Sequence, residues 1–176
     1  MLIPQARTVI DIGGQDSKVI EIDEKGNIVN FAMNDKCAAG TGRFLEVMAR
    51  VLNAGIEEIG PLSLEGTDPC QISNTCTVFA ESEMVSLRAD GKRREDILAG
   101  IHSAMAHRVA IMGGSIGFRD RVVFTGGVAR NAGMKKALQD RIGKEVLVPD
   151  NPQIVGALGA AIIARDKRRC APARNP

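Results

Sequence analysis

Residues 8–16 read TVIDIGGQD, a short β-branched run that ends in paired glycines followed by two polar residues. This pattern predicts a buried strand that carries Asp11 to a glycine-rich turn. Residues 17–23 predict a second strand, and a turn over residues 24–27 leads to a third strand over residues 28–33. Because these connections are tight, we expect the three strands to be antiparallel neighbours in one sheet.

The last third of the chain repeats the order of a strand followed by a helix. A strand is predicted over residues 121–125, a helix over residues 134–142 and another strand over residues 145–148. A final helix begins at about residue 154, and its glycines and alanines suit close packing against a sheet. Strand–helix–strand–helix order predicts parallel strands joined by crossovers, so the whole sheet should be mixed.

Helices are predicted for the middle of the sequence. Apolar residues at helical spacing predict helices over residues 43–52, 77–87 and 94–113. Residues 56–73 contain two prolines and are predicted to be irregular. The predicted fold class is therefore α/β, a mixed β-sheet with flanking helices and a helical, cysteine-bearing insertion over about residues 34–118.

Length and charge predict one domain with a short tail. The chain has 176 residues, enough for one domain with its own core. Four basic residues within 167–176 contribute +4 to a net charge of +2, so residues 1–166 carry a net charge of −2. We therefore expect a domain over residues 1–166 and a basic, disordered tail over residues 167–176.

Composition also argues against some partners. Tryptophan and tyrosine are absent and only five phenylalanines are present, which argues against base stacking and hence against a nucleic-acid partner. There is no secretory leader and no apolar run of membrane-spanning length, so we expect a cytoplasmic protein without a membrane partner. Structural disulfides are rare in that compartment. Four cysteines there indicate metal binding, catalysis or plain burial.

Two of the four cysteines precede predicted helices. Cys37 lies in NDKCAAGTG at residues 34–42, and Cys76 lies in NTCT at residues 74–77. Unpaired N–H groups and the positive end of the helix dipole favour a thiolate near a helix start. No pair has the C-x-x-C spacing of zinc ribbons or local iron–sulfur motifs. Burial as a small, inert hydrophobe is therefore the alternative for each cysteine.

Two glycine turns are suited to a nucleotide. The segment from Asp11 to Asp16 puts backbone N–H groups beside carboxylates, which suits phosphate oxygens and a magnesium ion. Gly126 and Gly127 form a second turn between a strand and a helix. For either glycine pair alone, the alternative is a simple tight turn. Neither a P-loop nor a Rossmann glycine motif is present.

Together these stretches resemble a known family. Residues 11–16, 34–42, 74–83 and 125–131 look like the activator ATPases of 2-hydroxyacyl-CoA dehydratases and the related ATPase subunits of benzoyl-CoA reductase. The resemblance runs in order through about residues 7–166. It implies the acetate/sugar kinase–Hsp70–actin fold, which is ribonuclease H-like. It also implies a homodimer bridged by one [4Fe–4S] cluster, in which ATP hydrolysis is coupled to one-electron transfer into a partner enzyme.

The resemblance also implies roles for individual residues. Cys37 and Cys76 match the cluster ligands, and two chains would supply the four thiolates of a cubane. Cys70 and Cys170 match no motif and receive no role. Two residues match catalytic positions, and five match positions that bind ATP or ADP with magnesium. The catalytic residues are Asp11 and Gln15, and the nucleotide-binding residues are Gly13, Gly14, Asp16, Gly126 and Gly127.

Partners follow from the same resemblance. They are a second copy of the chain, an acyl-CoA dehydratase or reductase component, and a ferredoxin or flavodoxin as electron donor. Members have two lobes, and this sequence matches the second. We expect the first lobe to come from a longer form of the protein or from a separate chain. The alternatives are a cluster- or metal-binding dimerisation module without ATPase activity, and a small-molecule kinase of the same superfamily.

Overall fold

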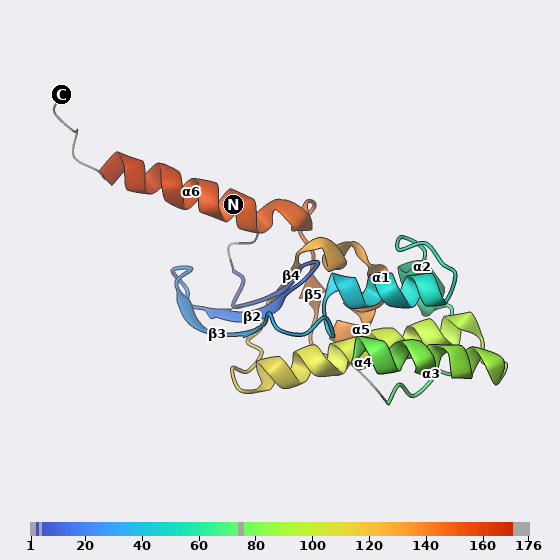
Figure 1. Ribbon diagram of the computed structural model, residues 1–176. Helices are drawn as coiled ribbons and strands as arrows, with labels where there is room; N and C mark the ends of the chain where they lie inside the picture. Colours follow the sequence, from blue (N-terminus) through green and yellow to red (C-terminus); the bar gives the residue numbers. More distant parts are fainter. Residues whose placement is uncertain (1–2, 4, 74–75, 171–176) are drawn as a thin grey trace, which may run out of the picture.

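A five-stranded mixed sheet forms the centre of the protein (Figure 1). The computed structural model describes residues 3, 5–73 and 76–170, without the side chains of residues 169 and 170. The strand order is β3-β2-β1-β4-β5. As the sequence predicted, β1 pairs with β2 and β2 with β3 in antiparallel fashion, whereas β4 is parallel to both β1 and β5. The strands are β1 Thr8–Ile12, β2 Ser17–Ile22, β3 Ile28–Asn34, β4 Val122–Thr125 and β5 Val146–Leu147.

Most helices lie where the apolar periodicity predicted them. Four helices match predicted segments to within a few residues, and a short fifth one, α2, was missed. That stretch was predicted to be irregular because proline normally breaks a helix, but Pro61 lies in the first turn of α2, where its missing N–H costs no hydrogen bond. The helices are α1 Gly42–Val51, α2 Ile59–Leu64, α3 Thr77–Ala89, α4 Arg94–Gly114 and α5 Ala132–Ile142. Two short 3-10 turns, η1 Gly127–Arg130 and η2 Pro152–Ile154, follow strands β4 and β5.

The core lies between the sheet and these helices. Alternation along β1 buries Ile10 and Ile12, and Phe124 of the neighbouring strand β4 is buried beside them. Phe44 of α1 and Ile101 of α4 belong to the same hydrophobic cluster. The far edge of the sheet is different, because β3 carries large apolar side chains that are exposed. These are Ile28, Val29, Phe31 and Met33.

The last helix departs from the prediction. Helix α6, Val155–Cys170, extends away from the rest of the protein (Figure 1). A Cβ added at Gly156 or Gly159 would meet no atom within 4 Å, and Leu158 is exposed. The prediction that these small residues pack closely against a sheet is therefore wrong for the described structure. Helix α6 also includes residues 167–170, which were assigned to the tail; residues 171–176 lie outside the described range.

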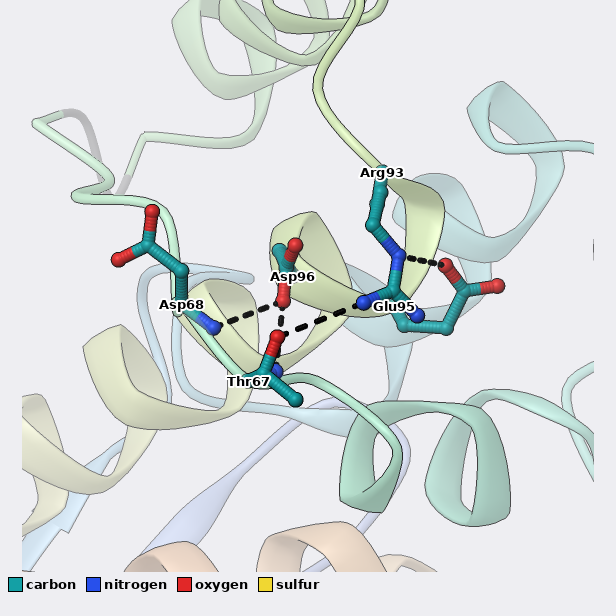
Figure 2. A network of polar contacts seen from close by, with 5 residues as sticks. All are labelled: Thr67, Asp68, Arg93, Glu95 and Asp96. Carbon is teal, nitrogen blue, oxygen red and sulfur yellow. Dashed lines mark hydrogen bonds and ion pairs between the residues drawn. The ribbon is translucent and has the colours of Figure 1, made fainter.

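A buried carboxylate fastens the loop between α2 and α3 (Figure 2). Asp96, in the first turn of α4, accepts N–H bonds from Thr67 at 2.8 Å and from Asp68 at 3.0 Å. The main-chain carbonyl of Asp96 also accepts a hydrogen bond from the N–H of Cys70 at 2.9 Å. The N–H of Asp68, with a smaller contribution from that of Thr67, holds the pKa of Asp96 below its ordinary value against the opposing effect of burial. The loop is therefore fixed to α4 through an ionised side chain.

Replacing this carboxylate should lower stability in a pH-dependent way. Because the pKa of Asp96 is lower in the folded state than in the unfolded chain, its ionised carboxylate stabilises the fold. This contribution to the free energy of unfolding is fully present above the unfolded-state pKa of about 3.9. It is lost as the pH falls through the folded-state pKa. Asp96→Ala should therefore lower Tm at pH 7, and the difference from wild type should shrink near pH 3. Asp90→Ala, at the exposed C-cap of α3, is the control. Thermal unfolding followed by circular dichroism tests this, and equal Tm values for Asp96→Ala and wild type at pH 7 would contradict it.

Candidate functional site

The two glycine turns lie at the same end of two central strands. Strands β1 and β4 are parallel neighbours, with Asp11 opposite Thr125 in the register. The Thr125 hydroxyl donates a 2.6 Å hydrogen bond to the Asp11 carboxylate, which fixes the direction of that side chain. As predicted, a buried strand carries Asp11 to the first glycine turn, and the pairing with β4 places Asp11 beside the Gly126–Gly127 turn. This edge of the sheet is where ligands bind in folds with parallel strands.

Close backbone contact explains the glycine at position 126. Its φ is +88°, and an added Cβ would lie 2.2 Å from the carbonyl oxygen of Ile12. The second turn therefore packs directly on the end of β1. Gly13 closes the first turn, because its N–H donates to the carbonyl of Asp16 at 2.9 Å. The second turn could not keep its shape with a larger residue at Gly126, whereas a Cβ at Gly13 would meet chiefly the movable carboxylate of Asp16, at 2.8 Å.

A cleft of about 300 Å³ opens between these turns and the first turns of α1 and α5. Of the predicted nucleotide residues, Gly13, Gly14 and Gly127 line this cleft. The other four do not line it: Asp11 is bonded to Thr125, Gln15 is exposed, Asp16 is paired with Lys18, and Gly126 packs on Ile12.

Other elements complete the lining with polar residues that no motif indicated. Glu46 comes from α1, Glu57 from the loop before α2 and Gln153 from η2. Glu46, Glu57 and Gln153 are far apart in the sequence and only the fold brings them together, so spacing alone could not have identified them. Asn131, which ends the family-like stretch 125–131, also lines the cleft and caps α5, because its side-chain oxygen accepts a hydrogen bond from the N–H of Met134 at 2.9 Å.

A buried histidine, His102, lies on α4, the helix that packs against α5. His102 of α4 is only 1% exposed, and its Nδ1 donates to the carbonyl of Leu98 at 2.8 Å. Its Nε2 has no hydrogen-bond partner among the described residues. Burial lowers the pKa of His102, against the smaller opposing effect of the hydrogen bond to the Leu98 carbonyl. The imidazole is therefore neutral at neutral pH and supports the packing of α4 on α5.

Cys37 lies in the loop between β3 and α1. Its carbonyl and that of Ala39 both accept hydrogen bonds, each of 2.9 Å, from the side-chain amide of Asn34. As predicted, Cys37 precedes a helix; the N-cap of α1 is Thr41, four residues further along. Cys37 is partly buried in this loop and does not belong to the hydrophobic core.

Cys76 does lie at a helix start, as predicted, because it is the N-cap of α3 and is exposed. The preceding residues of its motif, Asn74 and Thr75, lie outside the described range. Helices α1 and α3 pack against each other and run in the same direction, so the segments that carry the two cysteines approach the same end of the pair (Figure 1). Within residues 3, 5–73 and 76–170, no three or more His, Cys, Asp or Glu side chains are grouped to hold a metal ion.

Cys70 has a different environment from these two cysteines. Its side chain packs against the hydrophobic core, and its carbonyl lies where a Cβ on Gly100 would be. Burial raises the pKa of the Cys70 thiol. A thiol held neutral in this way is a packing group, which agrees with the absence of a motif around it.

No helix of the described chain is both long enough and apolar enough to cross a membrane.

A pair of matched substitutions tests the contact between the turns. Gly126→Ala should lower the free energy of unfolding by at least about 2 kcal/mol, because it combines a left-handed backbone with a clash against Ile12. Gly127→Ala is the control, since its added Cβ would meet only the Gln153 side chain, at 3.8 Å, and should change stability by less than about 0.5 kcal/mol. Urea unfolding measures both values, and similar losses for the two variants would show that the close approach of the turns is not tight in solution.

Comparison with known proteins gives the family. A model of the BadF/BadG/BcrA/BcrD ATPase family matches residues 1–164. The chain is 51% identical to the 2-hydroxyisocaproyl-CoA dehydratase activator of Clostridioides difficile, over 96% of this chain and 63% of the relative. It is 49% identical to the (R)-2-hydroxyglutaryl-CoA dehydratase activating ATPase of Acidaminococcus fermentans, over 93% of this chain and 63% of the relative. It is 39% identical to a benzoyl-CoA reductase subunit of Thauera aromatica, over 92% of this chain and 59% of the relative.

Solved structures agree with the sequence comparison. The activator of the 2-hydroxyisocaproyl-CoA dehydratase from Clostridium difficile with bound ADPNP superposes with a TM-score of 0.91 at 47% identity, over 99% of this chain and 67% of that one. Component A of the Acidaminococcus fermentans (R)-2-hydroxyglutaryl-CoA dehydratase gives a TM-score of 0.90 at 49% identity, over 93% and 63%. The chain spans about 63% of the length of the dehydratase activators it matches. The predicted resemblance and the actin-like fold are confirmed, and the chain belongs to the BadF/BadG/BcrA/BcrD ATPase family.

Proposed function

We propose that this chain is the cluster- and phosphate-binding second lobe of an ATPase activator, which couples ATP hydrolysis to one-electron transfer into an acyl-CoA dehydratase or reductase. The observation that carries the proposal is the parallel register of β1 and β4, which brings both glycine turns to one cleft of about 300 Å³. A relative of the same fold, 47% identical, has ADPNP bound. A cleft between two glycine turns, beside a fixed carboxylate, suits a nucleoside triphosphate with magnesium.

In this proposal, the first turn meets the phosphates and the second meets the nucleoside. Gly13, Gly14 and Asp16 would hold phosphate oxygens and magnesium-bound water, while Gly126 and Gly127 would allow the nucleoside to approach the main chain. Asp11, held in place by Thr125, would orient a magnesium-bound water. Gln15 is exposed at the turn and would position the attacking water.

Cys37 and Cys76 are the proposed iron ligands. Both lie outside the core, on segments that approach the same end of the α1–α3 pair, so their thiols are available to a shared group. One chain offers two thiolates, and a two-fold axis would supply the four that a [4Fe–4S] cluster takes. Such a cluster supplies one-electron transfer when bound. The N-terminal ends of α1 and α3 would offset its negative charge.

The partners follow from the relatives and from the uncovered surfaces. An acyl-CoA dehydratase or reductase component would accept the electron, and a cytoplasmic ferredoxin or flavodoxin would donate it. Helix α6 exposes Leu158, Ile162 and Ile163, and apolar side chains on a projecting helix need a cover. We assign that cover to the first lobe, whether it belongs to a longer form of this protein or to a separate chain.

Iron analysis tests the cluster. Anaerobically purified protein should be brown and oxygen-sensitive, and should form a homodimer. Cys37→Ser or Cys76→Ser should each remove iron and weaken the dimer, because each change removes two of the four thiolates from the shared site. Iron and sulfide assays with analytical ultracentrifugation measure both effects.

The other two cysteines are the controls for this test. Cys70→Ser and Cys170→Ser should keep iron and dimer, with only a modest packing loss for Cys70→Ser. A colourless wild-type protein, or equal effects of all four substitutions, would rule out the cluster. An iron-free protein that transfers phosphate from ATP to a small substrate would favour the kinase alternative instead.

Calorimetry with Mg-ATP tests the nucleotide cleft. The isolated chain should bind Mg-ATP weakly, with a Kd of about 1 mM or higher, and should not hydrolyse it measurably, because one wall alone cannot enclose the phosphates. Gly127→Ala, which places a methyl group in the cleft, should weaken that binding further. Tight binding with turnover by this chain alone would show that the complete nucleotide site lies within these residues.

A further inference from the structure

The loop that carries Cys37 is attached at both ends to the first glycine turn. At one end, Asn34 is paired in the sheet with Ser17, the residue that directly follows the turn. At the other end, the N–H of Gly42 donates to the carbonyl of Gly13 at 2.8 Å, and the N–H of Arg43 donates to that of Gly14 at 2.8 Å. The turn, strands β2 and β3, and the Cys37 loop therefore form a closed ring.

Side chains inside this loop hold its main chain rigidly. The amide of Asn34 donates one hydrogen to the carbonyl of Cys37 and one to that of Ala39, both at 2.9 Å. The Thr41 hydroxyl donates to the carbonyl between them, that of Ala38, at 2.6 Å. Only a primary amide of this length offers two donors from one nitrogen, since aspartate offers none and serine offers one. The backbone of Cys37 therefore depends on Asn34.

The loop also packs closely against the turn and against α4. A Cβ added at Gly42 would lie 3.1 Å from the carbonyl oxygen of Gly13 and 3.2 Å from the Cα of Gly14. On the opposite side, Gly40 has φ +86°, and the Cδ of Arg108 lies 3.3 Å from where its Cβ would be. The first residue of α1 thus lies directly on the turn, and Arg108 supports the loop from behind.

We propose that Asn34 is the positioning residue for Cys37, and that the Cys37 loop moves as one unit with the turn over residues 13–16. A phosphate group held by the turn then changes the position and accessibility of the Cys37 thiol. This inference rests on the proposed function, because it takes the turn as the phosphate site and Cys37 as a ligand of the shared iron group. It adds the residues through which one site acts on the other.

Thiol reactivity tests the role of Asn34 without iron or nucleotide. In the reduced, metal-free full chain, the rate of alkylation by iodoacetamide is measured for each cysteine by peptide mass spectrometry. Asn34→Asp keeps the shape of the side chain but removes both donors, and should raise the Cys37 rate about tenfold while changing the Cys70 rate less than about twofold. Asn30→Asp, on the same strand and exposed, is the matched control and should change neither rate.

Two outcomes would overturn the positioning role. The first is an alkylation rate of Cys37 in Asn34→Asp that stays within about twofold of the wild-type rate. The two hydrogen bonds of Asn34 would then have no effect on the reactivity of the thiol. The other is a parallel rise in the Cys70 rate, which would indicate general loosening of the fold. Iron retention during chelation provides a second readout, since Asn34→Asp should lose iron faster than Asn30→Asp.

A second comparison tests the coupling to the turn. Gly42→Ala forces α1 away from Gly13 and should change the Cys37 rate severalfold, whereas Gly114→Ala, which meets no atom within 4 Å, should leave it unchanged. Mg-ATP well above its calorimetric Kd should also change the wild-type Cys37 rate, and less so in Asn34→Asp. Equal rates for both alanine variants, or bound Mg-ATP without a rate change, would overturn the coupling. Absence of Mg-ATP binding would count against the proposed cleft, and the alanine variants would still decide the coupling.

Discussion

The structure depends on the parallel pairing of β1 with β4. These strands are separated by more than a hundred residues, yet their register puts Asp11 beside Thr125, and the hydroxyl–carboxylate bond between the two side chains fixes it at the functional end. A shift of one residue would turn Ile10 and Ile12 out of the core, so hydrophobic burial enforces the same register. Two independent constraints, core packing and a partly buried hydrogen bond, therefore favour the same register and with it the cleft.

A second level of organisation is built on this edge of the sheet. The first turn touches the start of α1, the second touches the end of β1, and the N–H of Gly126 donates to the carbonyl of Pro152 at 2.9 Å. Each of these contacts is between main-chain atoms, so a change of side-chain rotamer cannot relieve a displacement of either partner. Protein interiors packed this closely transmit small displacements, because neighbours must move together. The candidate nucleotide site is therefore in direct contact with both the Cys37 loop and the base of α6.

Local patterns predicted the elements of this fold better than their contacts. Alternating and helical periodicities predicted the strands and the long helices, because burial of one face leaves a periodic apolar pattern in the sequence. The order of the elements predicted the mixed sheet, because short connections and helical crossovers determine the direction of neighbouring strands. Helix α2 was missed because proline breaks a helix in its interior but is tolerated in the first turn, where Pro61 lies. Glu57 and Gln153 were missed as cleft residues because nothing in their neighbours in sequence reports that tertiary contact. The small residues of α6 predicted close packing against the sheet, but the described structure leaves them exposed, because composition alone does not say which surface a helix covers.

Helix α6 projects from the protein directly after η2, whose Gln153 lines the cleft, so its length would magnify any small rotation at its base. Its sixteen residues span about 24 Å at the usual rise of an α-helix. The segment before it is fixed at Pro152, which is buried and whose carbonyl accepts a hydrogen bond from the N–H of Gly126. A rotation of about 10° at the base would therefore displace the far end of the helix by about 4 Å, a distance comparable to the width of a side chain. An angular change too small to disturb the sheet would thus become a displacement large enough to make or break a contact surface.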